Sequence, residues 1–351
     1  MVPFADHLLP IQYGNGTLHE HLHCRSHAGF FDISHMGQCL ILGDDAAYQF
    51  GRLIPNDITG LKPGEQKYTV LTNNDGGVMD DIIITRIESG LMIIVNAACK
   101  DKVFKYLYTH LSGQCCFNEL TGQALFALQG PAAESIMQKF STQAARLSFM
   151  QACGTYIDDI KCNISRSGYT GEDGFEILVG NNHAEQLARL LLDESEVEPI
   201  GLAARDTLRM EAGLCLYGHE IDESITPIEA GLSWLFKKNR NLPVGLDQGA
   251  FPGADRILAQ LQKGPDKIRT GLLVEGKIPV REGSEICNSE GIAVGRVTSG
   301  GFSPSLGRPI AMAMLDRNAA NLDNVLYAKV RDHRIAVTVA SLPFIPHRYH
   351  R

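Results

Sequence analysis

Two histidines near the start of the chain have the spacing of zinc ligands. His19-Glu20-His21-Leu22-His23 matches His-Glu-x-x-His, which on a helix places the outer histidines on one face and makes the glutamate a general base. A zinc site also needs a third protein ligand. Ser26 and Gly29 stand where the extended pattern has glycine and histidine, and residues 21–64 contain no glutamate. We therefore interpret the motif as a histidine cluster at the surface or beside the core, with a zinc hydrolase as the alternative.

Two adjacent carboxylates, Asp80 and Asp81, lead into the apolar run Ile82-Ile83-Ile84. Because side chains alternate between the faces of a strand, only one of the two can face a given pocket. A carboxylate at the start of such a strand is partly desolvated, so its pKa is free to move and it could orient or polarise an amine at neutral pH. A pair that caps the turn after Gly76-Gly77 is the alternative, and the pattern alone leaves both open.

Further along, residues 168–176 form a glycine-rich segment, Gly-Tyr-Thr-Gly-Glu-Asp-Gly-Phe-Glu. It lacks the Gly-Lys-Ser/Thr ending of a P-loop and the G-x-G-x-x-G of a dinucleotide site. Its glycines suit a backbone that approaches a ligand or bends sharply, and its carboxylates could accept paired N–H donors from a planar heterocycle. A tight hairpin with solvated acids is the alternative.

Two arginines and the single tryptophan complete the candidates. Arg205 and Arg209 lie four residues apart and share a helix face, with Asp206 near them. Either could bind a carboxylate, although an exposed ion pair within the helix is the simpler interpretation. Trp234 lies in an apolar segment, 231–236, and we expect it to pack in the core.

The elements that must position these residues follow from the apolar periodicity. Residues 66–98 predict a three-stranded meander, with strands at 67–72, 78–87 and 91–96. Apolar residues at helical spacing predict helices at 100–112, 183–192 and 202–212, the first with Val103, Phe104, Leu107, Tyr108 and Leu111 on its apolar face. Residues 239–253, rich in Gly, Pro and Asn, predict a loop.

The pattern of apolar and turn-forming residues changes after Lys267. Short apolar strands separated by turn residues are typical of a small β-barrel or sandwich, and we expect them at 271–274, 291–294, 310–315 and 334–339. We place a domain boundary near residue 265, which divides the chain into regions 1–265 and 266–351.

Composition narrows the class of protein. The net charge of −8 argues against a nucleic-acid or membrane-surface binder. No apolar run approaches the roughly 20 residues of a membrane helix. The nine cysteines contain no Cys-x-x-Cys pair, so we expect free thiols rather than a disulfide framework or a cysteine zinc site. We expect a cytoplasmic protein, and a mitochondrial matrix protein only if a targeting segment is missing.

Taken in chain order, these segments resemble the T-protein, or aminomethyltransferase, family of the glycine cleavage system. Each motif is weak alone, but their order along nearly the whole chain is specific. The matching segments are 31–37, 74–84, 95–98, 128–131, 167–176, 201–206, 209–218, 226–234 and 298–304.

This resemblance implies an α+β fold of three domains around a channel that holds tetrahydrofolate. Two interleaved domains would form the folate-binding region, 1–265, and a C-terminal β-barrel would follow at 266–351. The implied reaction transfers the methylene carbon from the aminomethyl group on the lipoyl arm of H-protein to tetrahydrofolate. Its products are 5,10-methylenetetrahydrofolate, ammonia and dihydrolipoyl H-protein. H-protein and tetrahydrofolate would be the partners, with no metal.

The resemblance also implies roles for individual residues. Asp81 corresponds to the family's essential aspartate, and we hypothesise that it contacts the folate nitrogens and assists attack or ammonia departure. Glu176 and Arg205 match folate-contacting residues, and Tyr349 matches a further contact. We expect three more residues to line the same pocket: Tyr68, Asn96 and Tyr169.

The sequence departs from the family at its start. Members usually begin well before Met1 and carry glycine and an aromatic residue where this chain has Asp6 and His7, so we expect a misassigned start or a lost opening segment. Two relatives of the same fold are alternatives, a folate-dependent demethylase or one-carbon transferase and an iron–sulfur assembly factor. The assembly factor's Lys-Gly-Cys-aromatic-x-Gly-Gln-Glu signature is not matched at 214–220. A non-catalytic folate-binding protein is a further alternative.

Overall fold

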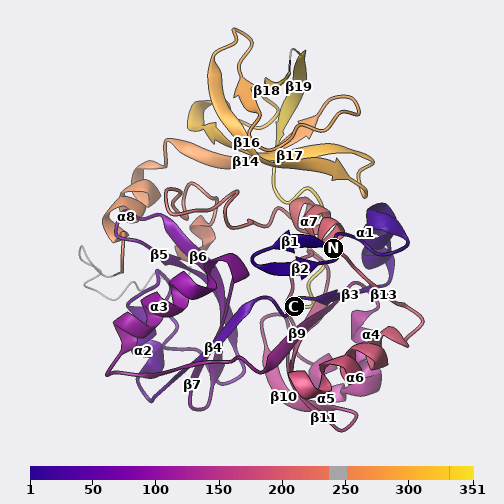
Figure 1. Ribbon diagram of the computed structural model, residues 1–351. Helices are drawn as coiled ribbons and strands as arrows, with labels where there is room; N and C mark the ends of the chain where they lie inside the picture. Colours follow the sequence, from indigo (N-terminus) through magenta and orange to yellow (C-terminus); the bar gives the residue numbers. More distant parts are fainter. Residues whose placement is uncertain (237–250, 332) are drawn as a thin grey trace.

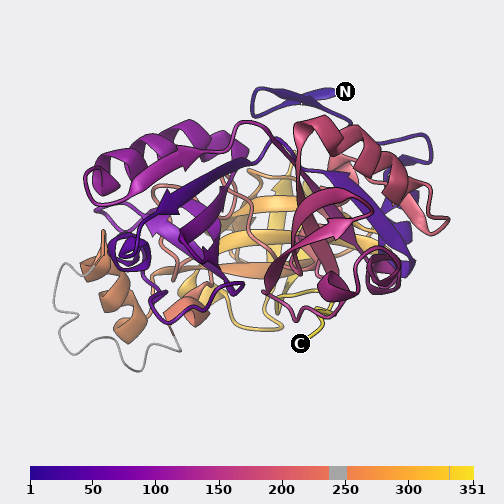
Figure 2. The ribbon, with the colours of Figure 1, turned by 90° about the horizontal axis from the view of Figure 1, so that it is seen from below.

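Three lobes surround the middle of the molecule (Figure 1), and the two termini lie on opposite sides of it (Figure 2). The computed structural model describes residues 1–236, 251–331 and 333–351. Most of the loop expected at 239–253 therefore lies outside the described residues. In the described part of the chain, no helix has the length and apolar character needed to cross a membrane.

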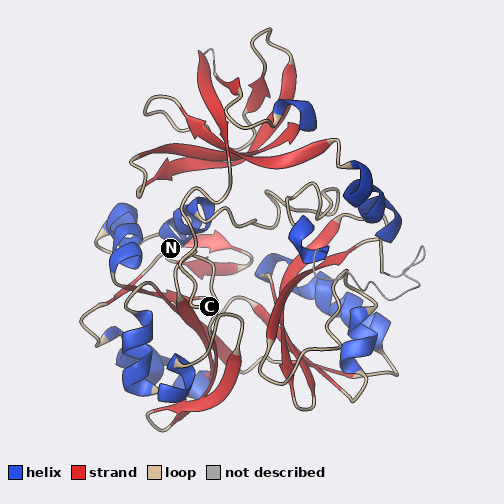
Figure 3. Ribbon diagram, turned by 180° about the vertical axis from the view of Figure 1, so that it is seen from behind, coloured by secondary structure: helices blue, strands red, loops and turns tan. Residues whose placement is uncertain are grey.

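The first lobe is an antiparallel sheet with helices on its outer face (Figure 3). Its core consists of the inward side chains of β4, β6 and β7 packed against α2 and α3. The strands, in sheet order, are β5 (Gln66–Thr72), β6 (Val78–Ile87), β7 (Gly90–Val95), β4 (Gly37–Leu42) and β8 (Cys116–Glu119), and the helices are α2 (Ala46–Gly51), η1 (Ala97–Cys99) and α3 (Lys100–Leu111). The predicted meander and the helix after it are confirmed.

The second lobe is a six-stranded sheet that packs on α4, α5 and α6. Its edge strand β13 runs parallel to β3, and the other neighbours are antiparallel. The strands, in sheet order, are β10 (Ala152–Ile157), β11 (Ile160–Ser165), β12 (Gly174–Gly180), β9 (Gln123–Gln129), β3 (Ala28–Asp32) and β13 (Val197–Pro199). Its helices are α1 (Gly16–Ser26), α4 (Ala133–Phe140), α5 (Thr142–Ala145), α6 (Asn181–Leu192) and α7 (Leu202–Glu211).

The chain passes between these two sheets more than once. β3 belongs to the second sheet, β4 to β8 form the first, and β9 returns to lie beside β3. A shared apolar cluster, which includes Ile94 from the first sheet, Leu125 from the second and Leu208 from α7, joins the facing sides. The two sheets are thus interleaved in sequence and packed together in space.

The third lobe is a closed six-stranded barrel with its own apolar core. Figure 2 shows its strands behind the space between the two sheets. The barrel contains β14 (Lys267–Val274), β17 (Arg308–Asp316), β16 (Ala293–Ser303), β15 (Glu285–Cys287), β18 (Val325–Val330) and β19 (His333–Ala340). The α+β fold with a C-terminal barrel is confirmed, and the sequence reading missed β15 and β18.

Short elements complete the described chain. Strands β1 (Val2–Phe4) and β2 (His7–Leu9) form a hairpin, α8 (Ala254–Lys263) precedes the barrel, and η2 (Ser233–Phe236) and η3 (Arg317–Ala319) are single turns. Helix α7 confirms the helix predicted at 202–212, and Gly213, with φ +65°, follows its end. The expectation that Tyr108 lies on the apolar face of α3 was wrong, because its side chain lies on the exposed side of the helix.

Candidate functional site

A large cavity of about 1990 Å³ lies where the three lobes meet. Both sheets, α7, the barrel and the C-terminal segment contribute to its walls. The seven residues proposed from the sequence all line it, although they are spread over some 280 positions of the chain: Tyr68, Asp81, Asn96, Tyr169, Glu176, Arg205 and Tyr349. The cavity is therefore the candidate site.

Strand β6 separates the two aspartates as strand geometry requires. Asp80 points into the core of the first lobe and is fully buried, whereas Asp81 is half-buried and lines the cavity. The Asn96 side-chain amide donates to Asp80 at 2.8 Å and to Asp81 at 2.7 Å. The Tyr68 hydroxyl donates to the other Asp81 oxygen at 3.1 Å. Asp81 is thus held by two donors with its carboxylate exposed to the cavity.

Burial raises the pKa of both aspartates above the ordinary carboxyl range. At Asp80 the neighbouring Asp81 charge raises the pKa further, and at Asp81 the bonds from Tyr68 and Asn96 oppose the rise. A carboxyl group whose pKa lies closer to neutrality exchanges protons more readily with an amine. Asp81 therefore has the environment of a general acid or base.

The part of the wall that the second lobe forms carries a carboxylate and a guanidinium. Glu176, on β12, accepts a hydrogen bond from the Ser167 hydroxyl at 2.9 Å, and burial raises its pKa. Arg205, on α7, lies over the Tyr169 ring with 4.8 Å between Cζ and the ring centroid. Within residues 1–236, 251–331 and 333–351, no carboxylate lies within ion-pair distance of Arg205. Its donors are thus available to a ligand in the cavity.

Aromatic rings and a neutral histidine line other parts of the wall. Tyr349 stacks on Phe149 with ring centroids 4.1 Å apart and planes at 6°. His35 is buried, and its Nδ1 has no hydrogen-bond partner in the described chain. Burial, with the Arg205 charge, lowers the pKa of His35 to about 4, so the ring is neutral at physiological pH. The sequence reading missed His35 as a site residue, although it lies in the motif at 31–37.

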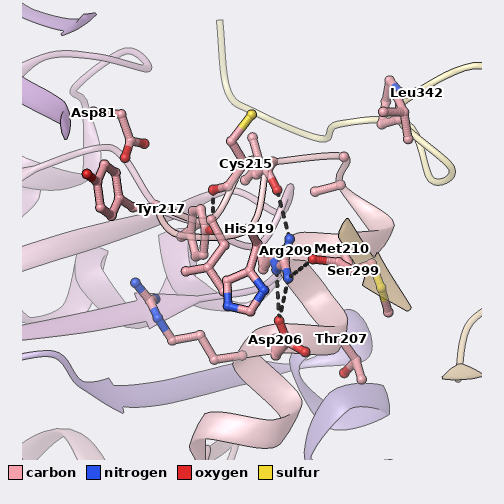
Figure 4. Close-up of a pocket in the computed structure, with 18 of the residues that line it drawn as sticks. Asp81, Asp206, Thr207, Arg209, Met210, Cys215, Tyr217, His219, Ser299 and Leu342 are labelled. Atoms are coloured by element: carbon pink, nitrogen blue, oxygen red, sulfur yellow. Dashed lines mark hydrogen bonds and ion pairs between the residues drawn. The ribbon is translucent and has the colours of Figure 1, made fainter. Parts of the chain in front are cut away.

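Arg209 plays a different part from Arg205. It is buried and bonds to Asp206 and Glu220, while its Nη2 donates to the Ser299 hydroxyl at 2.8 Å. Figure 4 shows this guanidinium beside Asp206 and Ser299, with Asp81 on another part of the cavity wall. The expected intrahelical ion pair forms between Arg209 and Asp206. Its expected exposure was wrong for Arg209, which is buried because it also joins α7 to the barrel strand β16.

Two further expectations need correction. Trp234 is 50% exposed, lines the cavity and stacks on Tyr68 with centroids 5.7 Å apart, so it does not belong to the core. In the segment 168–176, Glu172 is buried and pairs with Arg25, and Asp173 pairs with Arg166. The alternative of solvated acids was therefore wrong, and of the three carboxylates only Glu176 lines the cavity.

The zinc-hydrolase alternative is wrong, because Glu20 is not available as the general base that this reaction needs. Helix α1 does place His19 and His23 on one side. However, the buried Glu20 carboxylate accepts hydrogen bonds from the backbone N–H groups of Tyr13 and Gly201, at 2.5 and 2.8 Å. It therefore acts as a structural acceptor that ties α1 to the start of α7, and it cannot activate a water molecule.

Comparison with known proteins gives a consistent set of relatives. Residues 1–240 match the GCVT N-terminal domain, and residues 267–345 match the glycine cleavage T-protein C-terminal barrel domain. The chain is 40% identical to "Aminomethyltransferase, mitochondrial" of Dictyostelium discoideum, over 99% of this chain and 90% of that protein. The corresponding protein of Gallus gallus is 41% identical, over 100% and 90%.

A solved structure is similar over its full length. The glycine cleavage system aminomethyltransferase T from Bartonella henselae shares 40% sequence identity with this chain and superposes with a TM-score of 0.93. The match covers 100% of this chain and 95% of that one.

Proposed function

The chain belongs to the glycine cleavage T-protein family of aminomethyltransferases, and we propose that it performs the family reaction in the central cavity with Asp81 as its catalytic group. It is a transferase of the glycine cleavage system. In this reaction the methylene carbon leaves the sulfur and nitrogen of an aminomethyl-dihydrolipoyl group on H-protein and becomes bonded to N5 and N10 of tetrahydrofolate. Ammonia and dihydrolipoyl H-protein are released.

We assign Asp81 the proton chemistry of the transfer. As N5 bonds to the methylene carbon, the carbon–nitrogen bond to the amine breaks. The ionised Asp81 carboxylate would accept the proton that N5 loses and pass it to the amine, which leaves as ammonia. The carbon–sulfur bond then breaks as N10 bonds to the same carbon, and the proton that N10 loses ends on the dihydrolipoyl sulfur. The raised pKa of Asp81 suits both steps, because general acid–base catalysis is most effective when the pKa lies near the working pH.

The other cavity residues would bind and orient the folate. Glu176 is suited to accept paired N–H donors from the pterin edge, and Arg205 has donors available for folate oxygen atoms. Tyr349 would contact the ligand from the C-terminal segment, while Tyr68, Asn96 and Tyr169 would hold the surrounding groups in place. Positioning of this kind can supply a large part of the rate enhancement.

The observation that carries the proposal is the position of Asp81 on the wall of the cavity that Arg205 also lines, where Arg205 has no carboxylate partner among the described residues. The test is Asp81→Asn in an assay of ammonia release from aminomethyl-loaded H-protein with tetrahydrofolate. We expect turnover to fall by about 10²–10⁴-fold, with tetrahydrofolate affinity changed by only a few fold. Unchanged turnover would refute the role of Asp81.

The same assay tests the partner and the alternative reaction. Ammonia release that requires both H-protein and tetrahydrofolate supports the assignment. Activity on another methyl donor without H-protein would instead indicate the related demethylase. We also propose the division into a folate-binding region, 1–265, and a barrel domain, 266–351. The cytoplasmic location stays a prediction, since the Dictyostelium discoideum and Gallus gallus relatives carry "mitochondrial" in their names.

A further inference from the structure

We propose that His19, His23 and Glu198 form a binding site for a divalent zinc-type cation, separate from the catalytic cavity. The nitrogens of the two histidines and a carboxylate oxygen lie within 4.8 Å of one another. The histidines come from consecutive turns of α1, and Glu198 comes from the short strand β13 beside it. None of the three residues lines the cavity.

The separations suit a tetrahedral ion. His19 Nε2 lies 2.8 Å from one Glu198 oxygen, and His23 Nδ1 lies 3.5 Å from the other. An ion bonded at about 2.0–2.2 Å to each ligand requires neighbouring ligand atoms to be roughly 3.3 Å apart. One observed distance, 2.8 Å, is shorter than this spacing and the other, 3.5 Å, is longer. Small side-chain rotations would therefore bring the three ligands into tetrahedral geometry. Imidazole and carboxylate ligands suit Zn²⁺.

The hydrogen bond of His23 fixes which of its nitrogens is available. Its Nε2 lies 3.0 Å from the Glu196 carbonyl oxygen, which can only accept, so Nε2 carries the proton. In the neutral ring the lone pair of Nδ1 therefore points toward the Glu198 carboxylate, another acceptor. Two facing acceptors repel unless a proton or a metal cation lies between them. A backbone carbonyl that orients a histidine is also the usual second partner of a metal ligand.

Other contacts orient the remaining two ligands. Asn15 donates from its side-chain amide to Glu198 at 3.1 Å, and this bond can persist while the other carboxylate oxygen binds an ion. His19 Nε2 donates to Glu198 in the ion-free arrangement, and on binding its ring would carry the proton on Nδ1 instead. The His19 side chain is 50% exposed, which leaves room for water as the fourth ligand.

A bound cation would restrain the part of the cavity wall that α1 forms. Thr17 and Leu18, which precede His19 on α1, line the cavity. Three residues after Glu198 lies Gly201, which directly precedes α7 and donates its backbone N–H to Glu20. An ion that joins α1 to β13 therefore restrains the segments on both sides of that wall. It stabilises the folded chain, because it binds a site that the unfolded chain lacks.

The test is a Zn²⁺ titration of the full-length, chelator-treated protein by calorimetry, with a parallel measurement of the melting temperature. We expect one equivalent to bind tightly and to raise the melting temperature. His19→Asn and Glu198→Gln should each weaken binding at least about tenfold. His19→Asn is the safer variant, since its side chain is half exposed.

Two control variants separate this site from other zinc ligands. Cys116→Ser removes the exposed thiol of the Cys115-Cys116 pair, and His183→Asn removes an exposed histidine of α6. Both should bind Zn²⁺ as the parent protein does. The proposal is overturned if the parent binds no Zn²⁺, if all variants bind it equally, or if binding follows Cys116. A crystal soaked in Zn²⁺ with its anomalous peak away from His19 would overturn it as well.

Discussion

The side-chain amide of Asn96 lies between the carboxylates of Asp80 and Asp81 and donates to Asp81 at 2.7 Å. The antiparallel register explains this position, because Ile94 of β7 pairs with Ile83 of β6, and two residues further Asn96 comes beside Asp81. The backbone N–H of Asn96 also donates to Asp80 at 3.0 Å. One residue at the end of a strand thus sets the environment of both acids.

Replacing Asn96 with alanine should shift the pH dependence of the reaction. The hydrogen bond from the Asn96 side-chain amide stabilises the ionised form of Asp81, so losing it raises the pKa of Asp81 further. If the ionised carboxylate is the active form, turnover falls as the pH drops through this pKa. The acid limb of the profile should then move up by about one pH unit. Asn118→Ala, on the edge strand β8, is the control, and an unmoved limb in Asn96→Ala would contradict the proposal.

Tyr68→Phe should also move the acid limb of the pH–turnover profile to higher pH, and the protein should remain folded. This variant removes the hydroxyl donor to Asp81 but keeps the ring that stacks on Trp234. Because Tyr68 also stabilises the ionised carboxylate, its loss raises the pKa of Asp81. The measurement is the pH profile of turnover together with the melting temperature. A lower melting temperature with an unchanged profile would show that the hydroxyl is only structural.

Periodicity predicted the elements of the fold more reliably than it predicted exposure. Strand β6 begins and ends at the residues expected, because a turn-forming stretch precedes it and a glycine turn follows. The short strand β15 contains only three residues and was missed, since such a run has no measurable period. Trp234 was wrongly placed in the core because an apolar neighbourhood in sequence does not reveal a cavity.

Long-range pairing explains what the sequence could not predict about the site. Alternation along β6 requires the two aspartates to face opposite sides, but only the packing of α2 and α3 on one face determines that Asp81 meets the cavity. Glu220 and Ser299 are distant in sequence from Arg209 and yet bury its charge. Glu198 likewise joins His19 across 179 positions, so spacing within the histidine motif gave no sign of it.

The two arginines of α7 should respond differently to the same substitution. Arg205→Gln should raise the KM for tetrahydrofolate by about tenfold or more, since hydrogen bonds to charged groups contribute about 1.5–3 kcal/mol. Its effect on stability should stay within about 1 kcal/mol, because Arg205 makes no ion pair with any described carboxylate and contacts the Tyr169 ring instead. Arg209→Gln should instead lower stability by about 3–5 kcal/mol, as it leaves the buried Glu220 uncompensated. Equal stability losses in the two variants would refute this distinction.

Glu211 should account for a large, pH-dependent part of the stability. This fully buried carboxylate of α7 accepts bonds from His21, Arg25 and Ser305, the last on the loop after β16. Burial raises its pKa, but the bonds from His21, Ser303 and Ser305 outweigh burial and bring the pKa down to about 2. Glu211→Gln should therefore lower the free energy of unfolding by about 3 kcal/mol at neutral pH.

The pH window of this effect follows from the sign of the shift. A carboxyl group whose pKa is lower in the folded chain contributes its full stability above the unfolded value, about 4.3, and loses it as the pH falls toward about 2. The difference in melting temperature between parent and Glu211→Gln should thus be constant from pH 8 to about pH 5 and narrow below. Glu223→Gln, which breaks an exposed pair with Lys102, should cost at most about 1 kcal/mol. If the melting-temperature difference between the parent and Glu211→Gln stays the same in strong acid, then Glu211 stabilises the fold by its packing and not by its charge.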